Sequence, residues 1–277
     1  MKKIFRFLVC SAVALAANSS FAQEIIPVAP ANLKIDGKLD VFSDSLANYD
    51  KSSKIHYAFA HDANNLYVFI KANGQQEQSK IMAAGISVSV NNKGKKKETS
   101  TITFPVVDKA AMVSEWRNKV AQSRNNSGSK TNRTPEESVA MRKETRNKML
   151  NQYKEIKVSG LEGISMESVS IYNNYGLKTG INFDAQNNLI YELAIPLKLV
   201  RVSLDNEIAI NIKLNGIEIP ENRGQGDGQS RPSGGYGGGR SFGGGGYGGG
   251  RYSSGQGGDF SSMFTSSDFW VKAKFAQ

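Results

Sequence analysis

The sequence has almost no cysteine: Cys10 is the only one in 277 residues. It lies in an apolar run, residues 7–17, that follows a basic start with Lys2, Lys3 and Arg6. Such a run is too short to span a bilayer and is typical of a signal peptide. Small residues around Ala22 suit a signal peptidase, so we expect residues 1–22 to be removed. The mature chain would then carry neither a disulfide nor a thiolate metal site.

Histidine and tryptophan are also scarce, with His56, His61, Trp116 and Trp270 as the only examples. No pair of acids lies in a recognisable catalytic setting, and two histidines give little material for a nucleophile and its base. No later run is long and apolar enough for a transmembrane helix. These absences predict a protein that is not an enzyme and has no transmembrane segment. The signal peptide predicts export to the periplasm, the cell surface or the medium.

What is present is a series of short segments with alternating apolar residues. Residues 54–72 show it best, because two strands, each apolar on both faces, flank a polar turn at 61–65. A strand covered on both faces belongs inside a sandwich. Further strands are expected at 33–40, 81–90, 99–107, 164–172, 176–183, 189–195, 207–217 and 267–277. We therefore predict an all-β, antiparallel β-sandwich, formed as a single domain by residues 23–277.

Two segments interrupt the strand pattern. Residues 108–155 carry apolar residues at helical spacing, and Thr134-Pro135-Glu136-Glu137 is typical of a helix start. We expect a helical hairpin there, and it is basic, since residues 109–157 contain twelve Lys or Arg against five Glu. Residues 224–258 contain eighteen glycines. Such a composition cannot bury a core, so we expect a disordered loop.

Three stretches resemble carbohydrate-binding module family 9, within the DOMON-like β-sandwich group. They are Ile-Asp-Gly-Lys-Leu-Asp at 35–40, the Asp-x-x-x-Leu-Tyr-Val hairpin at 62–68 and Glu-x-x-Ile-Pro at 192–196. The resemblance implies an immunoglobulin-like or jelly-roll-like sandwich and a non-catalytic protein that binds glycans of the bacterial envelope. The family's tryptophan after the Ile-Asp-Gly turn is replaced here by Phe42, and Trp116 lies in the insert. The sugar site of the family is therefore either altered or lost.

Sugar binding needs aromatic faces for stacking, together with planar polar side chains. The candidates are Trp270, Tyr172, Tyr175 and Tyr191. The alternative is that these strand aromatics fill the core, because strands are enriched in aromatic residues in any case.

Asp36, Asp40, Asp44 and Asp62 are candidate calcium ligands, although the chain has no EF-hand pattern. Capping of turns by aspartate is the alternative that we favour. Some DOMON-like proteins bind haem through His and Met, but no motif around His56 or His61 selects an axial methionine. We therefore expect no cofactor, and leave calcium open.

The basic insert provides a second candidate surface, represented by Arg142, Lys143 and Arg146. It suits an anionic glycan, lipopolysaccharide or an anionic membrane surface, and a plain solvated helix pair is the alternative. Nucleic acid would suit the Gly-Arg-aromatic segment, but export places the protein in the wrong compartment. Two hypotheses result: a glycan-binding sandwich, or a structural or interaction protein on the same fold that contacts another envelope component through the insert.

Overall fold

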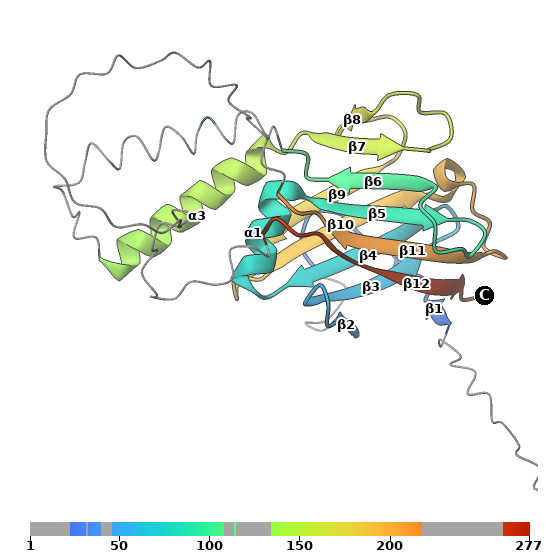
Figure 1. Ribbon diagram of the computed structural model, residues 1–277, viewed down its shortest axis with the longest axis horizontal. Coiled ribbons are helices and arrows are strands. Elements are labelled where there is room, and N and C mark those ends of the chain that lie inside the picture. The colour runs from blue at the N-terminus through green and yellow to red at the C-terminus, as the bar shows by residue number, and fades with distance from the viewer. Residues whose placement is uncertain (1–22, 32, 40–45, 108–113, 115–133, 218–262) are drawn as a thin grey trace, which may run out of the picture.

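Two β-sheets face each other across one apolar core in the computed structural model (Figure 1). The structure describes residues 23–31, 33–39, 46–107, 114, 134–217 and 263–277. The all-β, sandwich-like prediction is confirmed. Residues 1–22, which we predict to be a signal segment, lie outside the described residues, as do Phe42, Trp116, most of the first part of the predicted helical insert and the glycine-rich segment.

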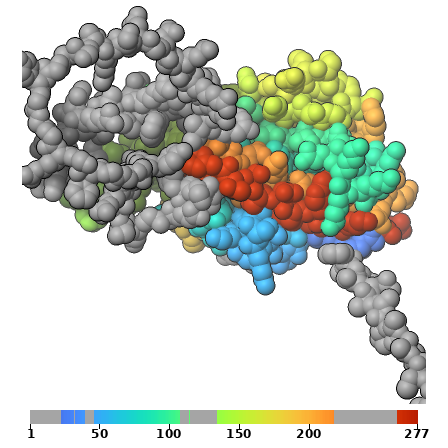
Figure 2. Space-filling model, in the orientation of Figure 1, coloured from blue at the N-terminus to red at the C-terminus, as the bar shows by residue number. Residues whose placement is uncertain are grey.

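The larger sheet has seven strands in the order β1-β12-β11-β5-β6-β7-β8. Their bounds are Glu24–Ile26, Ser267–Phe275, Glu207–Leu214, Ile86–Asn91, Ser100–Phe104, Glu155–Ser159 and Ser168–Ser170. All neighbours pair antiparallel except β1 and β12, which are parallel. The last strand of the chain therefore lies inside the sheet. In Figure 2, β12 runs as a red band across the front of the molecule.

The smaller sheet is fully antiparallel and has five strands in the order β2-β3-β4-β10-β9. Their bounds are Asn48–Asp50, Ile55–His61, Asn65–Ala72, Leu189–Pro196 and Lys178–Phe183. The predicted hairpin at 54–72 is confirmed as β3 and β4, and β4 is the central strand. Every residue of β10 is buried, as expected for a strand covered on both faces.

One predicted strand is partly wrong. Residues 81–84 belong to helix α1, Gln75–Ala84, and β5 starts only at Ile86. The apolar residues Ile81 and Met82 precede the alternating residues of β5, so the sequence analysis assigned them to the strand and did not predict the helix. Gly85 ends α1 with a φ of 76°, a conformation that favours glycine. Because α1 packs against β4 and β11, one strand of each sheet, it closes one end of the sandwich.

The predicted strand at 33–40 is also wrong, because residues 33–39 pair with no strand. They cross the outer face of the five-stranded sheet instead. The carboxylate of Glu192 on β10, which is buried, accepts the backbone N–H groups of Asp36 and Gly37 at 2.8 Å each. Two of the three stretches that carry the family resemblance, 35–40 and 192–196, therefore contact each other through Asp36, Gly37 and Glu192. The predicted turn is present, with Gly37 at a φ of 80°.

The insert contains helix α3, Pro135–Gln152, with the predicted start. Thr134 and Glu137 form a capping box, and Pro135 occupies the first turn. None of its residues is buried, and Figure 1 shows it projecting beside the sheets. No helix in the described part of the chain is long and apolar enough to cross a membrane. A short 3-10 helix, η1, Leu197–Val200, follows Pro196, the last residue of β10.

Candidate functional site

The outer face of the seven-stranded sheet carries small polar side chains in rows that cross the strands. Strand registers align Lys157, Thr103, Ser87, Lys213 and Asp268 in the first row, on β7, β6, β5, β11 and β12. The second row, two residues further along each strand, is Ser159, Thr101, Ser89, Asn211 and Trp270. We call these two rows the polar face. Their apolar neighbours along each strand point into the core, as the period of two requires.

The hydroxyl groups of the polar face bond to one another across the strands. Ser87 Oγ lies 2.7 Å from Thr103 Oγ1, and Ser89 Oγ lies 2.8 Å from Thr101 Oγ1. The amide of Asn215, just after β11, joins the first row by donating from Nδ2 to Ser87 Oγ at 3.0 Å and to the Ala84 carbonyl at 3.1 Å. This network fixes the side chains and gives a pre-organised set of donors and acceptors.

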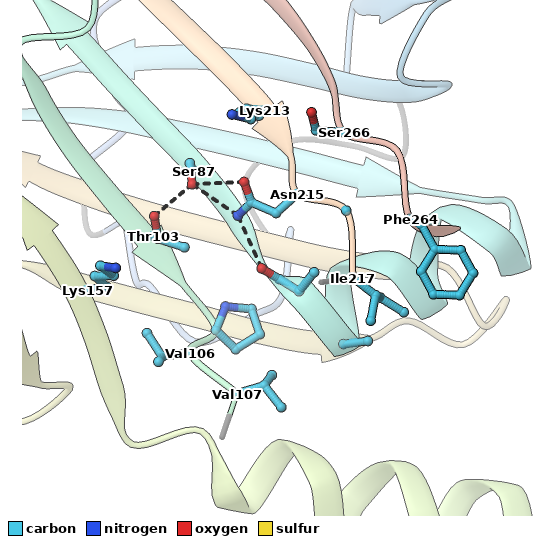
Figure 3. A pocket seen from close by; sticks show the side chains of 14 residues that line it. Ser87, Thr103, Val106, Val107, Lys157, Lys213, Asn215, Ile217, Phe264 and Ser266 are labelled. Carbon is cyan, nitrogen blue, oxygen red and sulfur yellow. Dashed lines mark hydrogen bonds between the residues drawn. The ribbon is translucent and has the colours of Figure 1, made fainter. Parts of the chain in front are cut away.

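A pocket of about 420 Å³ opens over the first row (Figure 3). Its floor contains Ser87, Thr103 and Asn215, with Lys157 and Lys213 on either side. Its wall is apolar and is formed by Val106, Val107, Ile217, Phe264 and neighbouring residues. The volume is within the range of small-molecule sites, roughly 300–1,000 Å³.

Backbone contacts hold the rim of this pocket in place. Ile217 N donates to the Met263 carbonyl at 2.8 Å, so the chain returns to the point from which it left the sheet. A Cβ on Gly216 would lie 2.3 Å from the Phe264 carbonyl oxygen, closer than any side chain tolerates. The residues that flank 218–262 on both sides are therefore held together, and the close approach of Gly216 to Phe264 requires glycine at that position.

Asn211, between Ser89 and Trp270 in the second row, has a hydrogen-bonding group without a partner. Its Nδ2 donates to Asp268 Oδ2 at 2.9 Å and to the Phe269 carbonyl at 3.0 Å. Its Oδ1 is buried and has no hydrogen-bond partner. A buried acceptor without a donor costs about 1–3 kcal/mol, so such groups call for an explanation. This acceptor lies directly opposite Trp270 on β12.

The structure does not bring the four predicted sugar-binding aromatics together. Trp270 is half-buried on the polar face, whereas Tyr172 is exposed in the β8–β9 connection, where Lys154 Nζ lies 5.8 Å from its ring centre. Tyr175 is half-buried beside a separate pocket at the other end of the sandwich. Tyr191 is fully buried between the sheets, so no glycan can stack on it. For Tyr191 the core alternative is correct, and Trp270 alone belongs to the polar face.

The two calcium candidates within the described residues, Asp36 and Asp62, accept hydrogen bonds in turns. Asp62 accepts from the Asn64 and Asn65 backbone N–H groups, both at 2.7 Å, and from the Tyr67 hydroxyl. Burial alone would raise the pKa of Asp62, but these hydrogen bonds outweigh burial and hold that pKa below its ordinary value. Asp36 accepts from Lys38 N, while Asp40 and Asp44 lie outside the described residues. Within the described ranges, no group of three or more acidic, histidine or cysteine residues is arranged to hold a metal ion.

The two histidines lie in different environments. His61 is buried, with Nε2 3.1 Å from the Ala276 carbonyl oxygen and its ring edge-on to Phe275. His56 contacts the ring of Tyr49 at 4.8 Å between centroids. His61 thus joins β3 to the end of the chain, a structural role.

The three basic residues proposed for the insert differ in their contacts. Arg142 and Lys143 are exposed on α3. Arg146 instead attaches the helix to the sandwich, with its guanidinium 4.4 Å from the ring centre of Phe183 and Nη1 donating to Asn187 Oδ1 at 3.2 Å. Arg142 and Lys143 are therefore the available part of that surface.

The polar face was missed by reasoning from the sequence. Its signal is the hydroxyl residue at every second position of β5 and β6, in Ile-Ser-Val-Ser-Val and Ser-Thr-Ile-Thr-Phe. Alternation was used only to find the core, and the polar half of the pattern was left without a role. Pairing of these strands with β7 and β11 could not be inferred from spacing alone, because the insert separates β6 from β7.

Comparisons with protein-family models, with curated proteins and with solved structures find no match to this chain, so its function has to be argued from the geometry described above.

Proposed function

We propose that this protein is a non-catalytic, exported glycan-binding protein and that its polar face is the binding surface. The observation that carries the proposal is the second row, where the half-buried Trp270 ends a line of hydroxyl and amide groups. An aromatic platform beside fixed planar and hydroxyl groups is the combination that sugar rings require, since C–H groups stack while hydroxyls are read by hydrogen bonds.

Burial limits which groups of the second row a sugar can reach. Ser89 and Asn211 are buried, whereas Thr101 and Trp270 are half-buried. A sugar unit would therefore stack on Trp270 and exchange hydrogen bonds with the Thr101 hydroxyl. The resemblance to carbohydrate-binding module family 9 agrees with this function, although the surface proposed here depends on the rows and not on the family's tryptophan.

Export is the second part of the proposal. Cleavage after Ala22 would leave Gln23 as the first residue, just before β1 begins at Glu24. N-terminal mass analysis of the protein isolated from cells checks this directly. A retained leader, or a lipid on Cys10, would contradict it.

A glycan array with the mature protein tests the binding function, and two variants test the surface. Trp270→Ala should weaken binding by roughly tenfold or more, since stacking and its buried area are lost. Tyr172→Ala is the matched control, because it removes an exposed aromatic elsewhere and should leave affinity unchanged. Loss caused by Tyr172→Ala alone would place the site in the β8–β9 connection, and an empty array would refute the glycan function.

An interaction protein on the same fold is the second candidate function. The observation that favours it is α3, eighteen residues long, with no buried side chain and with Val139 and Met141 exposed. A partner that covers α3 would explain this helix, and Arg142 and Lys143 would face an anionic component. Charge reversal of both residues should abolish such binding and leave glycan binding unchanged.

A further inference from the structure

The pocket over the first row has its own chemical character, set by two lysines. Lys157 and Lys213 lie at the two sides of the Ser87–Thr103 pair, in one line across four strands (Figure 3). Three steps of about 4.8 Å separate their backbones by roughly 14 Å. Their long flexible stems allow both ammonium groups to reach a ligand held over the hydroxyls.

Neither lysine has its charge neutralised by the described part of the chain. Lys157 and Lys213 form no ion pair there, whereas Lys71, Lys148 and Lys272 each do. The two carboxylates nearest in register, Asp268 and Glu155, are held by hydrogen bonds from Asn211 and Ser168 and form no ion pair with either lysine. The pocket thus combines hydroxyl and amide groups with two lysines that form no ion pair within the described part of the chain.

These groups select one class of ligand. The two lysine charges favour an anionic ligand. The paired hydroxyls and Asn215 favour a ligand rich in hydroxyl groups, which argues against a lipid surface. The apolar wall of Val106, Val107, Ile217 and Phe264 can cover the C–H face of a ring. Trp270 is one row away, a diagonal neighbour of Lys213 at about 7–8 Å between backbones, so one chain of sugar units can contact both.

We infer that the pocket formed by Lys157, Ser87, Thr103, Lys213 and Asn215 binds an acidic sugar unit, one with a carboxylate or sulfate group, of the glycan that stacks on Trp270. This inference rests on the proposed function and specifies its ligand. Salt dependence of binding cannot identify the surface by itself, because both the sandwich and α3 would bind anions. Only variants can separate the two surfaces.

The test uses a panel of uronate-containing oligosaccharides and the same oligosaccharides with their carboxylates reduced to alcohols. Sulfated oligosaccharides and their desulfated forms run in parallel and identify which acidic group is bound. At 10 mM salt, the mature protein should prefer one acidic series over its neutral counterpart by roughly tenfold, equivalent to about 1.4 kcal/mol. Raising the salt to 150 mM should reduce that preference, because the Debye length falls from about 30 Å to about 8 Å.

The decisive variant is Lys157→Gln combined with Lys213→Gln, which removes the charges and keeps polar side chains only one atom shorter. It should abolish the preference for the acidic series, and the two Lys→Arg changes should retain it. Lys178→Gln with Lys198→Gln is the matched control, because both residues are exposed and far from the pocket and the change in net charge is the same. This control should behave as the wild type does.

The outcomes separate the inference from the proposed function. Equal binding of acidic and neutral series, lost in Trp270→Ala and unaffected by the Lys→Gln pair, would overturn the inference and keep the function. A preference for acidic sugars that only reversal of Arg142 and Lys143 removes would also overturn it and assign the anion to α3. Absence of binding to every oligosaccharide would refute both.

Discussion

The two outer faces of the sandwich have opposite chemistry. On the five-stranded sheet, the outward side chains of β3 and β4 include Ala58, Ala60, Tyr67 and Phe69, and the preceding segment covers them with apolar side chains: Leu33, Ile35, Leu39 and Leu46. On the seven-stranded sheet, the outward positions of β5 and β6 are serine and threonine, which pair with one another.

This comparison indicates that the outer face of the five-stranded sheet contributes to folding, and that the outer face of the seven-stranded sheet is the one open to the proposed binding function. Apolar outward residues must be removed from water, and about 25 cal/mol per Å² of buried apolar surface favours covering them with the protein's own chain. Hydroxyl groups that pair across strands need no such cover. A sheet that keeps one outer face polar gives up that burial, as antiparallel sheets with one solvated face commonly do, and the proposed binding function would use this face.

The largest expected effect comes from the covered face. Phe69→Ala should destabilise the protein by roughly 3–5 kcal/mol, because a fully buried ring on the outer side of β4 leaves a cavity under the N-terminal segment. Urea unfolding measures the loss. Tyr172→Ala, an exposed aromatic, should change stability by less than about 0.5 kcal/mol. Equal effects of the two changes would mean that the cover contributes nothing to folding.

A smaller loss is expected where the cover is attached by polar contacts. Glu192→Ala should cost about 3 kcal/mol, because it leaves the part-buried N–H group of Asp36 and the buried N–H group of Gly37 without their carboxylate. Glu192→Gln keeps one acceptor and should lose less. Glu98→Ala, an exposed carboxylate in the β5–β6 connection, is the control and should be close to neutral in the same urea titration.

The two sheets should also differ in their response to acid. Asp62 and Asp184 close the turns of the five-stranded sheet, whereas neutral Asn91 accepts from Lys93 N and Lys95 N in the β5–β6 turn. Burial would raise the pKa of Asp184, but hydrogen bonds from Asn188 and the charge of Lys71 lower it overall, as the hydrogen bonds of Asp62 lower the pKa there.

A lowered folded pKa means that the ionised form favours the folded state. The contribution of each aspartate is complete above its ordinary pKa of about 3.9 and disappears as pH falls through the lower folded value. Each should amount to less than about 1 kcal/mol, since both groups are partly exposed. Asp62→Asn with Asp184→Asn should therefore flatten the fall in melting temperature below about pH 4. The same fall in melting temperature below pH 4 in the variant and the wild type would contradict this.

Much of the fold was predictable because its rules are local. Alternation located β3, β4, β9, β10, β11 and β12, and Thr134 and Pro135 located the start of α3. The errors arose where tertiary contacts decide. Residues 33–39 have strand-like alternation, but they pack on a sheet and bond to Glu192 instead of pairing. The three-residue strands β1 and β2 are too short to show any pattern.

Much less of the candidate site was predictable. Trp270 could be selected by residue type, since it is one of two tryptophans. Its neighbours Asn211 and Ser89 come from strands more than fifty residues away, and only the registers place them in one row. Tyr191 and Trp270 have the same aromatic character in sequence, but opposite positions in the sandwich, because the face of a strand depends on what packs against it.

The smallest effect on stability is expected at the centre of the polar face. Thr103→Val keeps the shape of the side chain and removes only its hydroxyl. Ser87 Oγ keeps Asn215 as a partner, so no group is left without a hydrogen bond, and the loss should be about 0.5 kcal/mol or less. The same change should weaken binding of acidic oligosaccharides, because it removes one of the two hydroxyls on the floor of the pocket. A loss of stability near 2 kcal/mol would show that the hydroxyl rows hold the sheet together as the apolar cover does on the other side. Unchanged stability with weakened binding would instead show that the hydroxyl rows serve ligand binding and not folding. The two outer faces would then differ in function as well as in composition.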